Sequence, residues 1–188
     1  MNSKVSFCAL LALAMAITVF SSGCGQSTGS APPNYASALR DAPAPLAKLY
    51  SQANELLPGG KDAFEDRLKA LKGFPVVVNA WASWCGACIE EISMFQTLSA
   101  RFGTRVAFVG IDTEDSADEA ARFLARAPLP YPSYIDSDAD IRDSFRGLGL
   151  PNTAFFSRSG DLVSVKFGRY RDGDELEEEI REHALGTS

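Results

Sequence analysis

The sequence predicts one α/β domain, in which a central mixed β-sheet is flanked by helices. Three observations predict this fold class. Residues 75–80 and 106–111 are mostly apolar runs rich in β-branched residues, typical of strands buried on both faces. Segments with helical spacing of apolar residues alternate with these runs. Two further strand segments joined at Ser159-Gly160 form a hairpin, and one last helix follows it.

Composition sets limits on the class of protein. The chain has 188 residues, of which 46% are hydrophobic and 22% charged, so one domain with a proper core can form. Its formal net charge is −6, and it has no basic patch. The sequence therefore predicts no nucleic-acid partner, and no attachment to a membrane through a polybasic surface.

The first 24 residues resemble a secretory targeting segment. Lys4 precedes the apolar run 5–20, which is shorter than the roughly 20 residues of a membrane span. The segment ends in Ser22-Gly23-Cys24 and resembles the lipobox of bacterial lipoproteins, although Ser21 stands where such boxes usually carry Leu. An uncleaved signal-anchor, or ordinary cleavage that leaves Cys24 free, are the alternatives. We expect a signal peptide over 1–23 and lipid on Cys24; every alternative places the domain outside the cytoplasm.

The next region predicts a tether and then the start of the domain. Residues 24–45 are rich in Gly, Ser, Ala and Pro and predict a flexible linker, with the folded domain over 46–188. Apolar residues from Leu46 to Leu57 have helical spacing and stop at Pro58, which predicts one helix. Asp62 and Glu65 predict the capped start of a second.

The remaining elements follow in chain order. Beyond the two buried strands, we expect helices over 88–102, 116–127 and 138–145, strands over 133–135, 153–156 and 162–167, and a final helix that begins at Asp172. Ser116 with Glu119, and Asp172 with Glu175, have the spacing of N-terminal caps. The helix over 116–127 and the strand over 133–135 are an insertion between the second buried strand and the helix before the hairpin.

The motif that carries chemistry is Cys85-Gly86-Ala87-Cys88, between a buried strand and a long helix. A cysteine where a helix begins meets free N–H groups and the positive end of the helix dipole, and both favour its thiolate. The second sulfur is close enough to displace a product bound to the first. The motif predicts a redox-active dithiol, provided that Cys85 lies at the helix start and is not buried away from solvent.

Other uses of the four cysteines fit less well. Cys8 leaves with the signal peptide, and Cys24 is taken by lipid. A zinc site needs about four ligands, and beyond the pair the mature chain offers only His183, so we expect no metal and no other cofactor. A structural disulfide between Cys85 and Cys88 would close a short loop and stabilise the fold only modestly.

Residues 76–88, Val-Val-Val-Asn-Ala-Trp-Ala-Ser-Trp-Cys-Gly-Ala-Cys, resemble the active-site region of the TlpA/ResA group of thioredoxin-like proteins. Residues 149–156, Gly-Leu-Pro-Asn-Thr-Ala-Phe-Phe, are similar to that group's second motif. The resemblance covers roughly residues 64–185. It implies a thioredoxin-like fold; the two predicted N-terminal helices stand where many relatives have a hairpin.

The resemblance also implies roles for particular residues. Cys85 is the attacking thiol and Cys88 the resolving one. Pro151 is a cis-proline facing the disulfide, and Leu150 presents its backbone to an extended substrate. Trp84 belongs to the same substrate-binding group. We expect both Trp81 and Trp84 mainly to pack so that they shield the disulfide, and an aromatic lid is the alternative.

Two polar residues carry the resemblance further. Asn79 stands six residues before Cys85, where cytoplasmic thioredoxins have a buried Asp and the TlpA/ResA group commonly has Asn. Glu91 stands one helical turn after Cys88, where several reductases of the group place a glutamate able to take the proton of the resolving thiol. The alternative for Glu91 is a solvated helix residue, as expected for its neighbour Glu90.

The implied function is a membrane-anchored, extracytoplasmic thiol–disulfide oxidoreductase. The resemblance suggests a disulfide reductase of exported proteins, of the cytochrome c maturation type, re-reduced by a membrane donor of the DsbD/CcdA type and acting as a monomer. Ala87 and Ser93 replace prolines common in the group, and the residues between the cysteines affect redox poise. A disulfide-forming oxidant and a redox-inert binding lipoprotein are therefore the alternatives.

Overall fold

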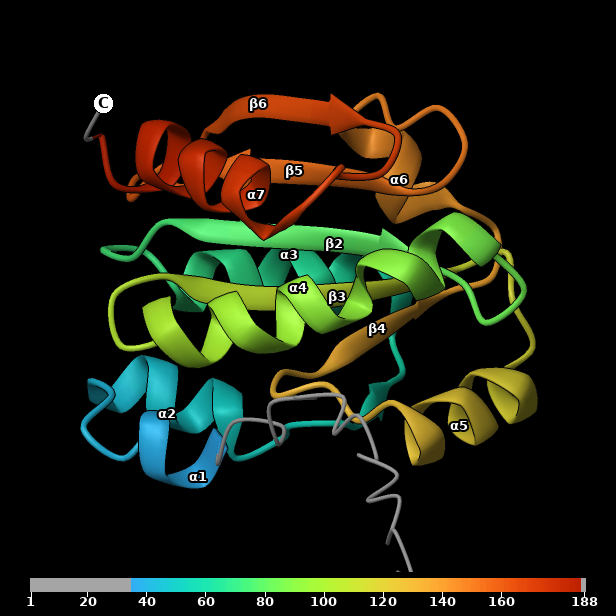
Figure 1. The fold of residues 1–188 in the computed structure, drawn as a ribbon, viewed down its shortest axis with the longest axis horizontal. Helices are drawn as coiled ribbons and strands as arrows, with labels where there is room; N and C mark the ends of the chain where they lie inside the picture. The colour runs from blue at the N-terminus through green and yellow to red at the C-terminus, as the bar shows by residue number, and fades with distance from the viewer. Residues whose placement is uncertain (1–34, 187–188) are drawn as a thin grey trace, which may run out of the picture. The chain divides into compact units, whose positions relative to one another are not determined.

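A six-stranded mixed β-sheet forms the centre of residues 35–186, the part of the chain that the computed structural model describes (Figure 1). Its order is β1-β4-β3-β2-β5-β6. β1 to β4 run parallel to one another, whereas β5 pairs antiparallel with β2, and β6 pairs antiparallel with β5. The strands are β1 Leu56–Leu57, β2 Val76–Trp81, β3 Ala107–Thr113, β4 Ser133–Asp136, β5 Asn152–Phe156 and β6 Leu162–Phe167.

Helices cover both faces of this sheet. α4 and α7 lie side by side on the face toward the viewer in Figure 1, and α3 lies behind the sheet next to α6. The helices are α1 Tyr35–Ala38, α2 Ala44–Tyr50, α3 Gly60–Ala70, α4 Gly86–Phe102, α5 Ala117–Arg126, α6 Asp140–Ser144 and α7 Gly173–Glu179, which continues as a π-helical turn over Ile180–Ala184. None of the helices in these residues is both long enough and apolar enough to cross a bilayer.

The predicted fold class is confirmed, and the two apolar runs are the two central strands. Every residue of β2 and β3 is buried, as expected for strands covered by helices on both faces. The inserted helix and strand are α5 and β4, and β4 extends the sheet beyond β3. The hairpin is β5 and β6, and its outer strand β6 is an edge with exposed residues.

The predicted helix from Leu46 to Leu57 is wrong in its second half. α2 ends at Tyr50, and Leu56–Leu57 form β1, which pairs with Ser133 and Tyr134 of β4. Asn54 lies between them with φ 65°, its N–H bonded to the carbonyl of Tyr131 and its side chain accepting the N–H of Leu129. Pairing with the distant strand β4 thus makes a strand of residues whose spacing alone indicates a helix.

Two of the three predicted caps also need correction. α3 begins earlier than predicted: its N-cap is Gly59, whose φ of 101° favours glycine, and Asp62 lies inside the first turn. Ser116 is the N-cap of α5 but forms no side-chain capping bond, and Glu119 pairs with Arg122 instead. Asp172 does cap α7, since its carboxylate accepts the N–H of Glu175 at 3.0 Å.

The folded part of the chain begins earlier than the predicted linker allows. Tyr35–Ala38 form α1, Leu39 is buried in the main apolar core, and α2 begins at Ala44. These residues therefore belong to the domain rather than to the tether. The predicted signal peptide over 1–23 and the predicted lipid site Cys24 lie outside the described residues.

Candidate active site

The two cysteines of the CxxC motif form a disulfide at the start of α4. The Cys85 and Cys88 sulfurs are 2.03 Å apart, and their Cα atoms are 5.3 Å apart. Cys85 is the N-cap residue of α4, and its sulfur accepts the backbone N–H of Cys88 at 3.2 Å. In the reduced protein the same N–H and the helix dipole favour a thiolate at Cys85. The predicted position at a helix start is confirmed.

Exposure of the pair is small and unequal. Cys85 is 6% exposed and Cys88 1% exposed. Both cysteines are therefore buried in this disulfide form, and the expectation of a solvent-accessible Cys85 is not met, since only a small part of its surface reaches solvent. A foreign disulfide can reach the pair only through Cys85, and only by fitting closely against the surface around it.

Glu91 lies inside the protein and not on a solvated helix face. It is 1% exposed, one turn of α4 beyond Cys88. Its carboxylate accepts the backbone N–H of Tyr170 at 3.2 Å and, more loosely, the side-chain N–H of Asn79 at 3.4 Å. The solvated alternative for Glu91 is wrong. Asn79 comes from β2 and Tyr170 from the loop before α7. A strand and a loop thus supply the two donors to the buried carboxyl of Glu91 on α4.

Burial sets the acidity of Glu91. Loss of solvent raises the pKa of this carboxyl from 4.5 to about 7, and the N–H donors of Tyr170 and Asn79 and the cations Arg169 and Lys166 limit the rise. An acid that titrates near neutral pH can both take and return a proton under physiological conditions. Its place on the helix face of Cys88 makes it the candidate proton acceptor for that thiol.

The second sequence motif lies at the same end of the sheet. Asn152 pairs with Ala80 in the β2–β5 ladder, so Pro151 comes opposite Trp81, where β2 ends and the loop to Cys85 begins. The Leu150–Pro151 peptide bond is cis, as the resemblance implies. The carbonyl of Pro151 accepts the N–H of Gly168, while the backbone of Leu150 bonds to no other described residue.

The two tryptophans differ sharply in burial. Trp81 is fully buried, packs against Phe123 and donates to the hydroxyl of Ser133 at 3.1 Å. Trp84 is 60% exposed, and its indole N–H donates to the carbonyl of Glu114 at 2.9 Å. Trp81 is thus a packing residue of the core, whereas its predicted packing over the disulfide stays a prediction, and the packing prediction is wrong for Trp84. Trp84, next to Cys85, is a surface residue instead.

Comparison with known proteins agrees with this geometry. The family model described as "AhpC/TSA family" matches residues 52–165. The thiol:disulfide interchange protein DsbE of Escherichia coli (strain K12) is 31% identical over 158 residues, which are 84% of this chain and 77% of that protein. This chain is a thioredoxin-like thiol–disulfide oxidoreductase of the DsbE and ResA type.

Two further likenesses fit that assignment. The thiol-disulfide oxidoreductase ResA of Oceanobacillus iheyensis is 28% identical over 106 residues, 54% of each chain. The crystal structure of a secreted Mycobacterium tuberculosis disulfide oxidoreductase homologous to E. coli DsbE superposes with a TM-score of 0.55 at 23% identity, covering 61% of this chain and 85% of that one. The latter supports the thioredoxin-like fold.

Sequence reasoning missed a group of residues on the loop after β3 of this oxidoreductase. Asp115 accepts the backbone N–H of Ser83 at 2.5 Å, and the carbonyl of Glu114 holds the indole of Trp84. Both contacts fall on the two residues directly before Cys85. Asp112, at the end of β3, is a carboxyl 1% exposed. An acidic residue that directly continues the apolar run 106–111 was the available signal.

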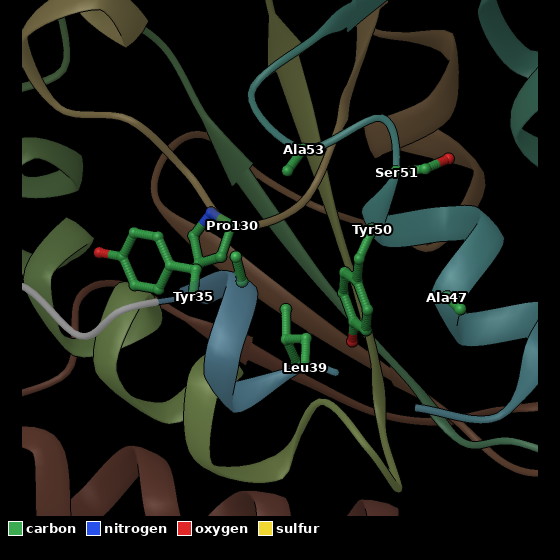
Figure 2. A pocket seen from close by; sticks show the side chains of 8 residues that line it. Tyr35, Leu39, Ala47, Tyr50, Ser51, Ala53 and Pro130 are labelled. Carbon is green, nitrogen blue, oxygen red and sulfur yellow. The ribbon is translucent and has the colours of Figure 1, made fainter. Parts of the chain in front are cut away.

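The oxidoreductase also has an apolar pocket that none of these residues lines. Its volume is about 610 Å³, and it lies beside α1 and α2. Figure 2 shows Tyr35 and Pro130 on one side of it and Tyr50 on the other, and none of the predicted site residues lines it. Among residues 35–186, no group of three or more His, Cys, Asp or Glu side chains is arranged to hold a metal ion.

Proposed function

We propose that this oxidoreductase acts outside the cytoplasm, anchored to a membrane by lipid on Cys24, and reduces disulfides in exported proteins. The observation that carries the proposal is the combination of Cys85 and Cys88 at the start of α4 with Glu91 buried one turn further on. A dithiol and a proton acceptor that titrates near neutral pH are the parts a reductase needs.

In the first step the Cys85 thiolate attacks one sulfur of a substrate disulfide. A bond forms between Cys85 and that sulfur, and the substrate's own S–S bond breaks. The other substrate sulfur leaves as a thiolate and takes a proton from solvent. The N–H of Cys88 and the start of α4 favour the attacking thiolate.

In the second step the Cys88 thiol gives its proton to the Glu91 carboxylate, and its sulfur attacks Cys85. The Cys85–Cys88 bond forms, the mixed disulfide breaks, and the second substrate sulfur leaves as a thiolate that is protonated in turn. One electron pair has passed from the protein dithiol to the substrate. Re-reduction needs another dithiol, which we assign to a membrane donor of the DsbD/CcdA type.

The surface near Cys85 is the proposed substrate-binding face. Trp84, Ile89 and Leu148 are 60%, 46% and 84% exposed, although apolar. Leu150 has a backbone free of other described residues, so an extended peptide can bond to it beside Pro151. Because the small opening at Cys85 demands a close fit, we propose that these residues bind an unfolded, cysteine-bearing segment such as that of an apocytochrome c.

The direction of electron flow is tested by the reduction potential of the Cys85–Cys88 pair. We expect a potential of about −250 mV or below, the range of reducing thioredoxins; a value well above about −180 mV would assign the protein to disulfide formation instead. The titration uses the full chain carrying Cys24→Ser. Insulin reduction that disappears in Cys85→Ser links the activity to this pair, and activity that persists there contradicts the assignment of Cys85.

The anchor is tested separately. Mass spectrometry of the N-terminal peptide from the mature protein is expected to find a lipidated Cys24, and Cys24→Ala is expected to release the protein from membranes. A mature chain that begins elsewhere, with Cys24 unmodified, would contradict the anchor and leave the chemistry of Cys85 and Cys88 unaffected. Gel filtration of the detergent-solubilised protein checks the expected monomer.

A further inference from the structure

A buried carboxyl that the reaction above does not use lies near the active-site loop. Asp112 is 1% exposed, and neither of its carboxyl oxygens meets a hydrogen-bond donor among the described residues. It pairs with Trp81 in the β2–β3 ladder, and Trp81 is the last residue of β2 before the loop that leads to Cys85. A fully ionised carboxylate without a donor is costly in such a place, so Asp112 needs a proton or a partner.

The partner is a second acid. Asp115 is close enough to Asp112 that its carboxyl group and its charge both raise the pKa of Asp112. Two carboxylates both lack a proton to donate, so a bond between them requires one shared proton. Asp115 already accepts N–H bonds on both oxygens, from Ser83 at 2.5 Å and from Ser116 at 2.7 Å. The negative charge therefore belongs on Asp115 and the proton on Asp112.

The other charged groups nearby agree with this assignment. Asp136, at the end of β4, adds negative charge near Asp112 but has its own donors, the hydroxyl of Thr113 and the N–H groups of Ile141 and Arg142. Arg142 is paired with Glu114 and Asp143, so its charge is already engaged. Burial, together with Asp115 and Asp136, raises the pKa of Asp112 to about 8.

We propose that Asp112 and Asp115 share one proton and act as positioning residues, holding the loop that carries Cys85 and coupling the Cys85 thiol to a second ionisation. The carboxylate of Asp115 fixes Ser83, two residues before Cys85, while the proton on Asp112 keeps the pair at one negative charge. When that proton is lost, a second negative charge arises beside the loop. This charge disfavours the Cys85 thiolate and repels Asp115 from Asp112. The inference rests on the dithiol chemistry of Cys85, and not on the direction of electron flow.

The test is the pH dependence of iodoacetamide alkylation at Cys85 between pH 5 and 10. It uses the full chain with Cys88→Ser and Glu91→Gln, because the thiol and carboxyl removed also titrate near Cys85. Alkylation is followed on the Cys85 peptide by mass spectrometry, so that Cys8 and Cys24 do not contribute. Asp112→Asn and Asp115→Asn are compared in this background with Asp118→Asn, an exposed acid on α5 that makes the same charge change.

We expect the parent curve to be broader than a single ionisation, because loss of the shared proton holds back the thiolate. Asp112→Asn should narrow it to one ionisation, because the acid that loses the proton is gone. Asp115→Asn leaves Asp112 buried and able to titrate, so that curve should keep two ionisations, with the second moved to lower pH. Asp118→Asn should leave the parent curve unchanged. Loss of fold stability alone does not change the number of ionisations that Cys85 reports. A single ionisation in the parent, a broad curve that survives in Asp112→Asn, or an Asp115→Asn curve identical to that of the parent would overturn the proposal. Failure of insulin reduction in the wild type concerns the proposed function and leaves this result standing.

Discussion

At the scale of single residues, the two buried acids Glu91 and Asp112 differ in the hydrogen-bond donors around their carboxyl groups. Each is 1% exposed. Glu91 accepts N–H bonds from Tyr170 and Asn79, which partly offset the cost of its charge. Asp112 has no such donor, and the nearby carboxyl of Asp115 raises its pKa further. Glu91 is therefore suited to gain and lose a proton near neutral pH, whereas Asp112 is suited to keep one.

Glu91→Gln is expected to slow resolution of the mixed disulfide about 100-fold above pH 7, the loss typical of a missing general base. The wild-type rate should rise as the pH passes about 7, because the carboxyl must first lose its proton, and the variant should lack this rise. Stopped-flow fluorescence, which follows the release of a labelled peptide from Cys85, measures this rate at each pH. Glu90→Gln, one residue earlier and paired with Arg169 at the surface, is the control; an unchanged pH profile in Glu91→Gln would rule out the base.

The two tryptophans give a second prediction at this scale. Trp81→Ala removes a fully buried ring and should cost about 3–5 kcal/mol of unfolding free energy. Trp84→Ala removes a ring that is 60% exposed and should cost less than about 1 kcal/mol, while raising the KM for a peptide substrate. Urea denaturation and steady-state kinetics on both variants measure the contrast. Equal losses of stability would mean that Trp84 packs in the core after all.

At the scale of elements, the positions of the helix starts decide the chemistry. Cys85 is the N-cap of α4, so the free N–H groups of the first turn of that helix meet the attacking sulfur. Asp172 is the N-cap of α7, two residues after Tyr170, whose N–H donates to Glu91. The loop before α5 carries Glu114 and Asp115, which hold Trp84 and Ser83. Three helix starts from distant parts of the sequence thus fix the residues that act on one sulfur pair.

The N-cap residues of α5 and α7 differ in whether their side chains form a capping hydrogen bond, and mutation can measure what that bond contributes to stability. Asp172→Ala should destabilise the protein by about 0.5–2 kcal/mol, because the capping bond to Glu175 is lost. Ser116→Ala should change the stability by less than about 0.5 kcal/mol, since that side chain forms no capping bond. Chemical denaturation at one pH compares them. A larger loss in Ser116→Ala would contradict the capping assignment.

At the scale of the whole molecule, two buried acids with raised pKa values make stability depend on pH. The folded state keeps protons on Glu91 and Asp112 up to about pH 7 and 8, whereas the unfolded chain releases them near pH 4. Between these limits the folded state binds more protons than the unfolded one. Their contribution to stability is therefore fully present below about pH 4 and is lost as the pH rises through 7 and 8.

We expect the unfolding free energy to fall between pH 5 and pH 9, with a slope of at most about 1.4 kcal/mol per pH unit for each acid. Glu91→Gln and Asp112→Asn should each flatten the curve, since neither amide titrates. Denaturant unfolding at pH 5, 7 and 9 measures the slope, with Asp118→Asn as a control that keeps it. A wild-type stability that rises over this range would show that neither acid is held protonated.

The sequence by itself determined the fold class, the order of the central elements and the reactive pair, because these depend on local pattern. The apolar runs of β2 and β3, the CxxC motif before a long helix, and the Leu150-Pro151 motif all lie within short stretches of chain. Glu91 could be selected in the same way, from its helical spacing to Cys88. Local spacing reports which residues share a face, and here it selected the candidate site residues.

Only the tertiary structure decided what surrounds those residues, because burial and pairing depend on contacts between distant segments. Leu56–Leu57 became a strand since β4 offers an edge, against their helical spacing. Trp81 and Trp84, three residues apart, ended on opposite sides of the core boundary. The raised pKa values of Glu91 and Asp112, and the hydrogen bond between Asp115 and Ser83, arise where side chains from separate elements come together and exclude water.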